Sequence, residues 1–198
     1  VKTNKTTSLK EIKSFVSKKS PWITKHLEKQ KVKKVNAQIE TGSLLYYLGE
    51  RYLVSVEEEL GLKKSTLEFV DSTFVIKTHI GITQEEILWH INMFYKKKAM
   101  ELIEPMVEEW SAKMELFPTF VGYRKAKTRW GSCSSRDRVS FSYYLMKLPL
   151  SLVEYVVVHE LAHIKHKNHS ADFWSLVESY LADYKQKEEK IREFERLF

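Results

Sequence analysis

One short segment of this chain holds most of its histidine. Four of the seven histidines lie between positions 159 and 169, and two of them frame the sequence His159-Glu160-Leu161-Ala162-His163. On an α-helix, residues four apart lie about 40° apart around the axis and roughly 6 Å apart along it, so both imidazoles can reach one metal ion. Glu160 lies beside them, where its carboxylate can take a proton from a water on that metal. The segment therefore predicts a hydrolytic Zn²⁺ site with about one ion per chain.

A third protein ligand is expected, because hydrolytic zinc sites use three side chains and keep the fourth position for water. On a continuous helix His166 would share the face of His159 but stand roughly 8 Å along the axis from the midpoint of the pair, too far to close a tetrahedron. His169 can ligate only if the helix ends and the chain folds back, and Asn168 tolerates the left-handed conformation of a helix C-cap. We therefore predict His169 as the third ligand and His166 as a surface or supporting residue.

The helix that carries the motif is expected to be buried. Residues 155–162 are apolar nearly all round the helix apart from His159 and Glu160. Burying such groups is costly unless they are paired or bound to metal, which favours a metal site. The capping-box pattern Ser151-Leu152-Val153-Glu154 predicts the start of this helix, and Ser170 is expected to cap the next one.

Several other side chains could act on the site. Glu178 on the next helix is an alternative third ligand; otherwise we expect Asp172 and Glu178, with Asp183, to support a ligand histidine by hydrogen bonding. Cys133 lies in a Gly/Ser-rich segment, residues 131–135, that is expected to be a turn. It could approach the zinc or act as a nucleophile, but we interpret it as a small structural cysteine because no histidine outside the cluster is an obvious base for it.

Composition limits the class of protein. The 198 residues include 33 Lys and Arg against 26 Asp and Glu, and the excess is heaviest in the first 34 residues, with eleven lysines and two glutamates. This charge permits nucleic acid or another anion as a partner, although a solvated lysine-rich face is the more common explanation. A single cysteine excludes an internal disulfide, and no apolar run is long enough to span a bilayer. We expect a cytoplasmic protein with no membrane partner.

The first part of the chain, residues 1–82, is expected to form a small region of helices and β-hairpins. Ser8-Leu9-Lys10-Glu11 is a capping box, and Ser20-Pro21 is expected to end that first helix and begin a second one toward Val35. Turn signals at 49–51 and 71–73 predict two hairpins that form an antiparallel sheet. Its core is expected to contain aromatic side chains, namely Tyr46, Tyr47, Tyr52 and Phe69.

The second part, residues 83–198, is expected to form the metal-binding domain. A capping box at Thr83–Glu86 opens the longest helical stretch, to about Leu116, which kinks or breaks at Pro105. His90 is interpreted as a packed histidine of that helix and not as a ligand. The expected core stripe consists of Ile87, Ile91, Phe94, Tyr95, Leu102, Met106 and Trp110. With a further strand at 138–144, the whole predicts an α+β fold whose active-site helix packs on a small sheet.

A cluster of cations precedes the motif. If residues 123–130 form a strand, Lys125, Lys127 and Arg129 share one face at intervals of about 6.6 Å. Such a face either protects the edge of a sheet from pairing or binds an anionic part of the substrate. We keep both interpretations.

Three stretches resemble the YgjP-like metallopeptidase family of zinc-dependent hydrolases: residues 128–133, residues 155–163, and residues 168–174 with Asn168-His169-Ser170 and Phe173-Trp174. The resemblance implies a zincin-like core with His159, His163 and His169 as metal ligands and Glu160 as the catalytic carboxylate. Some members of the family are catalogued as nucleotide pyrophosphatases.

Three functions follow as hypotheses. The leading one is a zinc metallopeptidase that cleaves a peptide or protein substrate, with Glu160 as general base. The second is a metal-dependent pyrophosphatase that hydrolyses the phosphoanhydride of a nucleotide at the same metal. The third is a basic nucleic-acid-binding module with a structural zinc, which should be closed by four protein ligands.

Overall fold

The protein is described here by a computed structural model that covers residues 7–35 and 38–196, without the side chains of 23 and 25–35. Helices and two small sheets give an α+β fold, as the sequence predicts. The chain forms two compact units, residues 1–39 and 40–198. The division between residues 82 and 83 that the sequence suggests therefore runs through the second unit. No helix of the described segments is long and apolar enough to cross a membrane.

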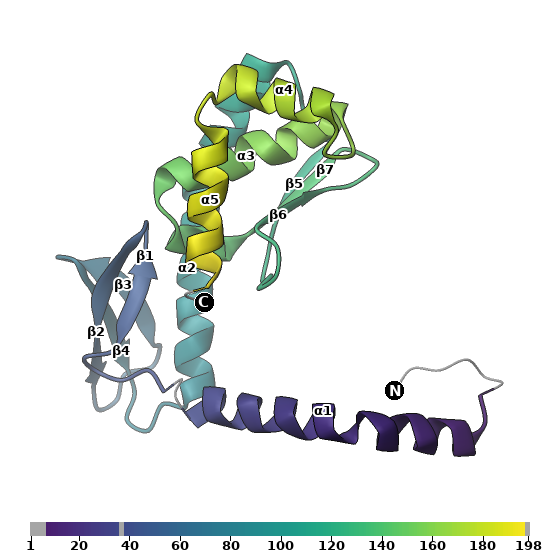
Figure 1. Cartoon of the computed structure of the whole chain (residues 1–198). Coiled ribbons are helices and arrows are strands. Elements are labelled where there is room, and N and C mark those ends of the chain that lie inside the picture. Colours follow the sequence, from purple (N-terminus) through teal and green to yellow (C-terminus); the bar gives the residue numbers. More distant parts are fainter. Residues whose placement is uncertain (1–6, 36–37, 197–198) are drawn as a thin grey trace. The chain divides into compact units, whose positions relative to one another are not determined.

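In the described part of the first unit, residues 9–35 form the helix α1 (Leu9–Val35) (Figure 1). Its capping box is confirmed: the Glu11 amide donates to Ser8 Oγ at 3.3 Å, and the Ser8 amide donates to Glu11 Oε2 at 2.9 Å. The predicted break at Ser20-Pro21 is wrong, because the helix runs through Pro21 without interruption. Proline removes one intrahelical hydrogen bond, and here both Pro21 and Ser17 are exposed, so water can bond to the carbonyl that loses its partner.

The second unit begins with a four-stranded sheet in the order β1-β2-β4-β3. Both predicted hairpins are confirmed, with positive φ at Leu48-Gly49 and at Asp71-Ser72, as two-residue hairpin turns require. The predicted antiparallel sheet is wrong, because β2 and β4 pair in parallel. The connection 59–65 places β3 two strand positions away from β2, and β4 then occupies the position between them. The strands are β1 (Leu44–Tyr47), β2 (Glu50–Glu58), β3 (Thr66–Val70) and β4 (Thr73–Thr78).

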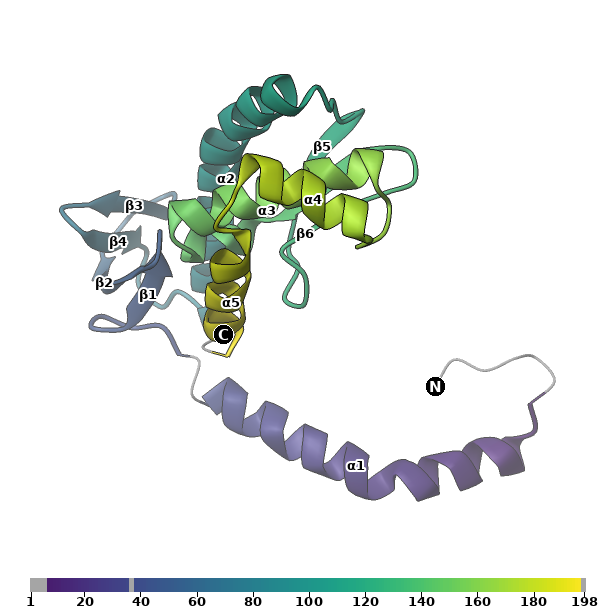
Figure 2. The same ribbon diagram turned by 45° about the horizontal axis from the view of Figure 1, so that its top comes forward.

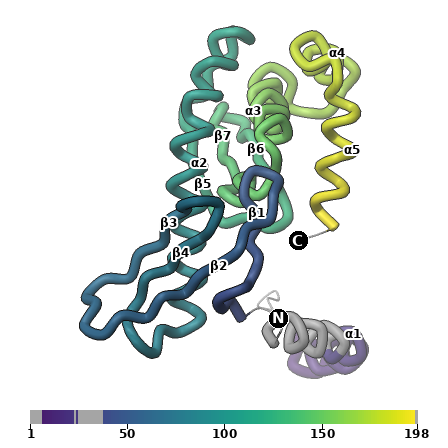
Figure 3. Tube along the Cα trace, turned by 90° about the vertical axis from the view of Figure 1, so that its left-hand side faces the viewer, coloured from purple at the N-terminus to yellow at the C-terminus, as the bar shows by residue number. Residues whose placement is uncertain are grey.

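The long helix α2 (Gln84–Met114) packs against both sheets (Figure 3). Its capping box is confirmed by the Glu86 amide, which donates to Thr83 Oγ1 at 3.3 Å. The helix continues through Pro105. Its core stripe differs from the predicted one in the second half, where Ile103 and Val107 are buried in place of Leu102 and Met106.

Aromatic side chains join the first sheet to α2. The rings of Phe74 and Tyr47 lie 5.3 and 5.5 Å from that of Phe94 on the helix, centroid to centroid. Tyr95 on the same helix donates its hydroxyl to the carbonyl of Tyr46 at 2.5 Å. Three of the predicted aromatic residues, Tyr47, Tyr52 and Phe69, form this cluster together with Phe74, whereas Tyr46 joins the helix through its carbonyl.

The second sheet supports the helix that bears the motif. Its order is β5-β7-β6, with β5 parallel and β6 antiparallel to β7. The motif helix α3 packs on β6 on one side and on α4 and α5 on the other (Figure 2). The elements are β5 (Phe120–Arg124), β6 (Gly131–Cys133), β7 (Arg138–Ser142), η1 (Tyr143–Lys147), α3 (Leu150–Lys165), α4 (Ala171–Tyr180) and α5 (Tyr184–Glu195).

The predicted cap of α3 is wrong. The helix α3 begins at Leu150 after Pro149, so Ser151 lies inside the helix and does not cap it. The carbonyl of Pro149 already accepts the amides of Leu152 and Val153 at 2.9 and 3.1 Å, which starts the helix one residue before the predicted box.

The segment 123–130 is not one strand. β5 ends at Arg124, residues 125–130 form a loop, and the expected turn 131–135 begins with strand β6. Buried Ser142 holds both ends of the loop: its hydroxyl donates to the Ala126 carbonyl at 2.7 Å, and its amide donates to the Trp130 carbonyl at 2.7 Å. A shared strand face for the three predicted cations is therefore excluded.

Candidate metal and catalytic site

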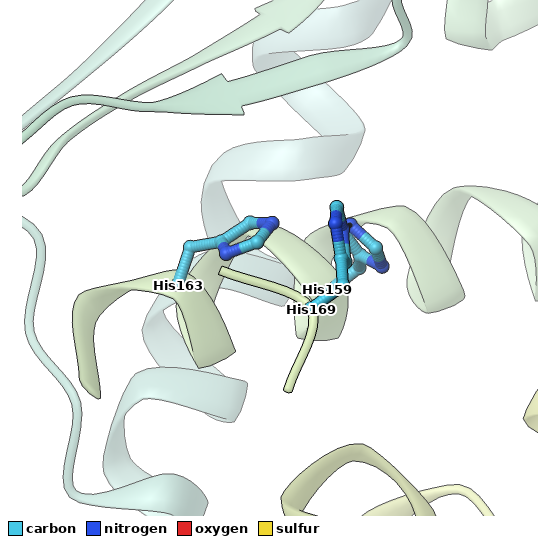
Figure 4. Close-up of side chains that lie close together, drawn as sticks. All are labelled: His159, His163 and His169. Carbon is cyan, nitrogen blue, oxygen red and sulfur yellow. Dashed lines mark hydrogen bonds between the residues drawn. The ribbon is translucent and has the colours of Figure 1, made fainter. Parts of the chain in front are cut away.

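Three histidine side chains converge at the end of α3 (Figure 4). His159 and His163 lie one turn apart on the helix, and His169 comes from the connection to α4. One nitrogen from each ring lies within 4.8 Å of the others, and His159 Nε2 is 3.0 Å from His169 Nε2. Nitrogen ligands of a tetrahedral zinc lie about 3.3 Å apart, given Zn–N bonds of about 2.05 Å. The arrangement fits a zinc ion held by these three rings.

The chain folds back after α3 without the left-handed residue that Asn168 suggested. The C-cap is His166, in an extended conformation with φ −122° and ψ 102°, and its amide donates to the Ala162 carbonyl at 3.0 Å. Four residues later Ser170 caps α4, as predicted, by accepting the amide of Phe173 at 3.3 Å. His169 is thus held between the end of one helix and the start of the next.

The second nitrogens of two rings have defined partners. His163 Nδ1 lies 2.9 Å from the carbonyl of His166, so this nitrogen donates and Nε2 keeps its lone pair. His159 Nδ1 lies 3.5 Å from the hydroxyl of Tyr155, one turn earlier. The supporting role of His166 therefore belongs to its backbone, and the contact of Tyr155 is one that the sequence analysis missed.

Aromatic rings of α4 orient the histidines. Phe173 stacks on His163 with centroids 4.5 Å apart, and Trp174 stacks on His169 at 5.4 Å. Asp172 and Glu178, expected to support a ligand histidine, are exposed, and within the described residues neither makes a hydrogen bond or ion pair with a histidine of the site. The adjacent pair Phe173-Trp174 was part of the family resemblance, but its contacts with the histidines were not predicted.

Glu160 is confined in a cleft that His159 also lines. It is 6% exposed, and its Oε2 has no hydrogen-bond partner among the described residues. A Cβ at Gly131 of β6 would lie 2.5 Å from Oε1 of Glu160, so only glycine allows this approach. A buried carboxylate oxygen without a partner is costly, which is typical of a group that serves function.

The electrostatics match a metal-binding site. Burial lowers the pKa of His159 to about 3, helped by His163 and His169, and burial also lowers the pKa of His163. Both rings are therefore neutral at pH 7 and can offer a lone pair to a cation. Burial raises the pKa of Glu160 to about 8, while the guanidinium groups of Arg124 and Arg129 oppose this rise.

Two hollows meet at the site. A cleft of about 250 Å³ opens over His159 and Glu160 and is closed on one side by α5. A neighbouring hollow of about 400 Å³ is lined by residues 126–130 and by Tyr144, Lys147 and Glu195. Trp130 and Glu195 line both, and the Trp130 indole donates to Glu195 Oε1 at 3.0 Å.

The three predicted cations and Cys133 do not all lie in the same place. Lys127 and Arg129 line the 400 Å³ hollow, whereas Lys125 is not part of its lining. The hollow also includes Lys147, which no motif had indicated. Cys133 lies on β6 with its Sγ 3.8 Å from Lys167 Nζ, outside the histidine cluster, and burial raises the pKa of its thiol.

A model of the YgjP-like metallopeptidase domain matches residues 1–194 of the chain. The chain belongs to this family. Membership confirms the resemblance seen in the sequence. The YgjP-like metallopeptidase family implies a divalent metal ion, typically zinc, and a peptide or protein substrate.

Two solved structures resemble part of this YgjP-like chain. The metallopeptidase zymogen abylysin of Pyrococcus abyssi is 24% identical over 45% of this chain and 90% of its own, with a TM-score of 0.41. The metallopeptidase zymogen jannalysin of Methanocaldococcus jannaschii is 21% identical over 48% of this chain and 97% of its own, with a TM-score of 0.42. A search of curated proteins found no match.

Proposed function

We propose that this YgjP-like chain is a zinc metallopeptidase in which His159, His163 and His169 hold one Zn²⁺ and Glu160 is the general base. One observation carries the proposal: a buried carboxylate with an unpartnered oxygen lines the same cleft as His159, one of three converging imidazoles. The cluster includes three ligand residues among those described, which suits a catalytic zinc with an open position better than a structural zinc with four protein ligands.

The chemistry divides between the ion and the chain. Zinc supplies a Lewis acid that lowers the pKa of a water and polarises a carbonyl. Glu160 accepts the proton of that water and passes it to the leaving amine. Because burial raises the pKa of Glu160 to about 8, the neutral acid predominates at pH 7 in the chain without metal. Arg124, Arg129 and a bound zinc cation would favour the ionised form, which is the form that can accept a proton. Gly131 keeps the space that the carboxylate occupies.

The edge of the second sheet supports a peptide as the substrate. β6 is an edge strand. On either side of it along the chain, the carbonyl of Trp130 and the amide of Ser134 hydrogen-bond to β7. Because backbone groups alternate in direction along an antiparallel strand, those of Gly131 and Cys133 point to the open side. An extended peptide can add to such an edge directly beside Glu160. A pyrophosphatase would use the nearby cations but would leave this edge without a role.

The variant Glu160→Gln tests the proposed base. It keeps the size and most hydrogen bonding of the side chain but cannot accept a proton, so we expect peptide hydrolysis to fall by about two or more orders of magnitude. Zinc content and melting temperature should stay at wild-type values. The assay sets zinc-loaded wild type and variant side by side against a peptide library and a panel of nucleoside triphosphates.

The matched control is Glu108→Gln, which removes the same charge from an exposed position on α2. It should keep full activity. Hydrolysis of nucleotides but not of any peptide by the wild type would overturn the proposed substrate class, and an active Glu160→Gln variant would overturn the role of the base.

A further inference from the structure

The hollow beside the metal cleft is a built feature with positive walls. Three cations line it, Lys127 and Arg129 from the loop 125–130 and Lys147 from η1, together with one carboxylate, Glu195. That carboxylate already accepts the indole N–H of Trp130. Its volume of about 400 Å³ exceeds that of the cleft over Glu160, with which it shares two lining residues. A chain bound in the cleft can therefore place a neighbouring group in the hollow.

The loop that supplies the cations is held in place before any ligand arrives. Ser142, 1% exposed, bonds to the carbonyls of Ala126 and Trp130, which bracket Lys127 and Arg129. Fixing both ends of a short loop limits the positions that its side chains can reach. A preorganised cation loses less entropy on binding an anion than one on a free loop.

Two of the cations in the hollow, Lys127 and Lys147, repel each other. Lys147 is half-buried and lies 4.8 Å from the centroid of the Tyr144 ring, which holds its ammonium group in place. Burial, together with the positive charge of Lys127, lowers the pKa of Lys147. Like charges brought together in a partly buried site destabilise it, and an anion bound between them relieves the repulsion.

We propose that this hollow is a substrate subsite that binds a carboxylate of the peptide, from an Asp or Glu side chain or from the C-terminus. The inference rests on the proposed peptidase function and adds a specificity to it. The open edge of β6 leads an extended chain past this hollow, and the planar fork of Arg129 suits the two oxygens of a carboxylate. Because the proposed substrate is a peptide, the anionic group that it can offer to these cations is a carboxylate.

Binding and cleavage of a defined peptide library test this subsite. Zinc-loaded Glu160→Gln is immobilised and equilibrated with a random octapeptide library, prepared with free and with amidated C-termini, and the bound peptides are sequenced by mass spectrometry. We expect Asp and Glu to be enriched about tenfold over Asn and Gln at one position. Adding Lys127→Gln and Lys147→Gln should remove most of that enrichment, with the remainder due to Arg129. Enrichment that survives C-terminal amidation assigns the carboxylate to a side chain, and enrichment confined to free acids assigns it to the terminus.

The control is Lys190→Gln, which removes the same charge from an exposed position of α5 outside the lining of the hollow and should leave the enrichment unchanged. Because Lys147 is half-buried, the exposed single variant Lys127→Gln is measured as well and should lose at least threefold of the enrichment. Melting curves of each variant verify the fold.

The outcomes separate the two proposals. Binding or cleavage of peptides without a preference for acidic residues overturns the subsite and leaves the peptidase proposal standing. Acidic enrichment on Glu160→Gln, with no peptide cleaved by the zinc-loaded wild type, keeps the subsite and overturns the catalytic proposal. Absence of peptide binding, or binding of a nucleoside triphosphate that depends on Lys127 and Lys147, overturns the subsite.

Discussion

At the scale of single residues, backbone contacts of the site matter as much as its ligand rings. The imidazole of His169 reaches His159, whereas His166 contributes a carbonyl that fixes the ring of His163. Because a backbone carbonyl remains when the side chain is replaced, we expect substitution of His166 to affect the site less than substitution of His169. Gly131 is a similar case, because the absence of a Cβ leaves room for the side chain of Glu160.

Zinc content separates the two histidines. His169→Ala removes one of three ring nitrogens, so we expect the protein to lose most of its roughly one zinc per chain on dialysis. His166→Ala keeps the carbonyl that accepts from His163 and should retain the metal. Elemental analysis after dialysis against a weak chelator measures both, and metal loss in His166→Ala but not in His169→Ala would contradict the ligand assignment.

At the scale of elements, the loop 125–130 and strand β6 act as one piece because Ser142 joins them. The hydroxyl of this serine donates to Ala126 and also accepts the amide of Tyr144 at 3.3 Å, which starts η1. One buried side chain therefore sets the path of the loop before β6 and of the turn after β7. Both lead to the hollow beside the site.

Removing that hydroxyl should destabilise the fold. Ser142→Ala leaves the Ala126 carbonyl and the Tyr144 amide without their partner, at a cost of about 1–3 kcal/mol in the free energy of unfolding. The control is Ser140→Ala on the same strand, whose half-buried hydroxyl makes no hydrogen bond among the described residues and which should change stability by less than about 0.5 kcal/mol. Urea denaturation followed by tryptophan fluorescence compares the two, and equal stabilities would contradict the anchoring role.

At the scale of the whole molecule, the core and the site belong to the second compact unit. Every buried side chain among those described lies between Tyr47 and Ile191. The described side chains of α1 include exposed apolar ones, namely Leu9, Phe15, Val16 and Trp22.

Deleting residues 1–39 should leave a folded, metal-binding protein. Residues 40–198 retain both sheets, α2 and all three histidines, so we expect cooperative thermal unfolding within a few degrees of the full chain and about one zinc per chain. Differential scanning calorimetry and elemental analysis provide the measurement. A non-cooperative transition in the shortened chain would show that the first unit is needed for the fold.

Much of the site could be read from local patterns. The spacing of His159 and His163 and the capping boxes at Ser8 and Thr83 involve residues within four positions of each other, where helical geometry alone decides which groups meet. The two hairpins follow from short turn signals in the same way. The box at Ser151 shows the limit of this logic, because a preceding proline carbonyl started the helix earlier.

The amino-acid sequence by itself thus determined the helix that carries His159 and His163, its burial and the family resemblance, since each depends on residue types at fixed short spacings. Only the tertiary structure decided the features that join distant segments. These are the parallel pairing of β2 with β4, the contact of Gly131 with Glu160, and the meeting of Lys147 with the loop 125–130. These features share one physical reason. They depend on packing and buried hydrogen bonds between segments far apart in the chain, and the local periodicity of a sequence does not predict such contacts.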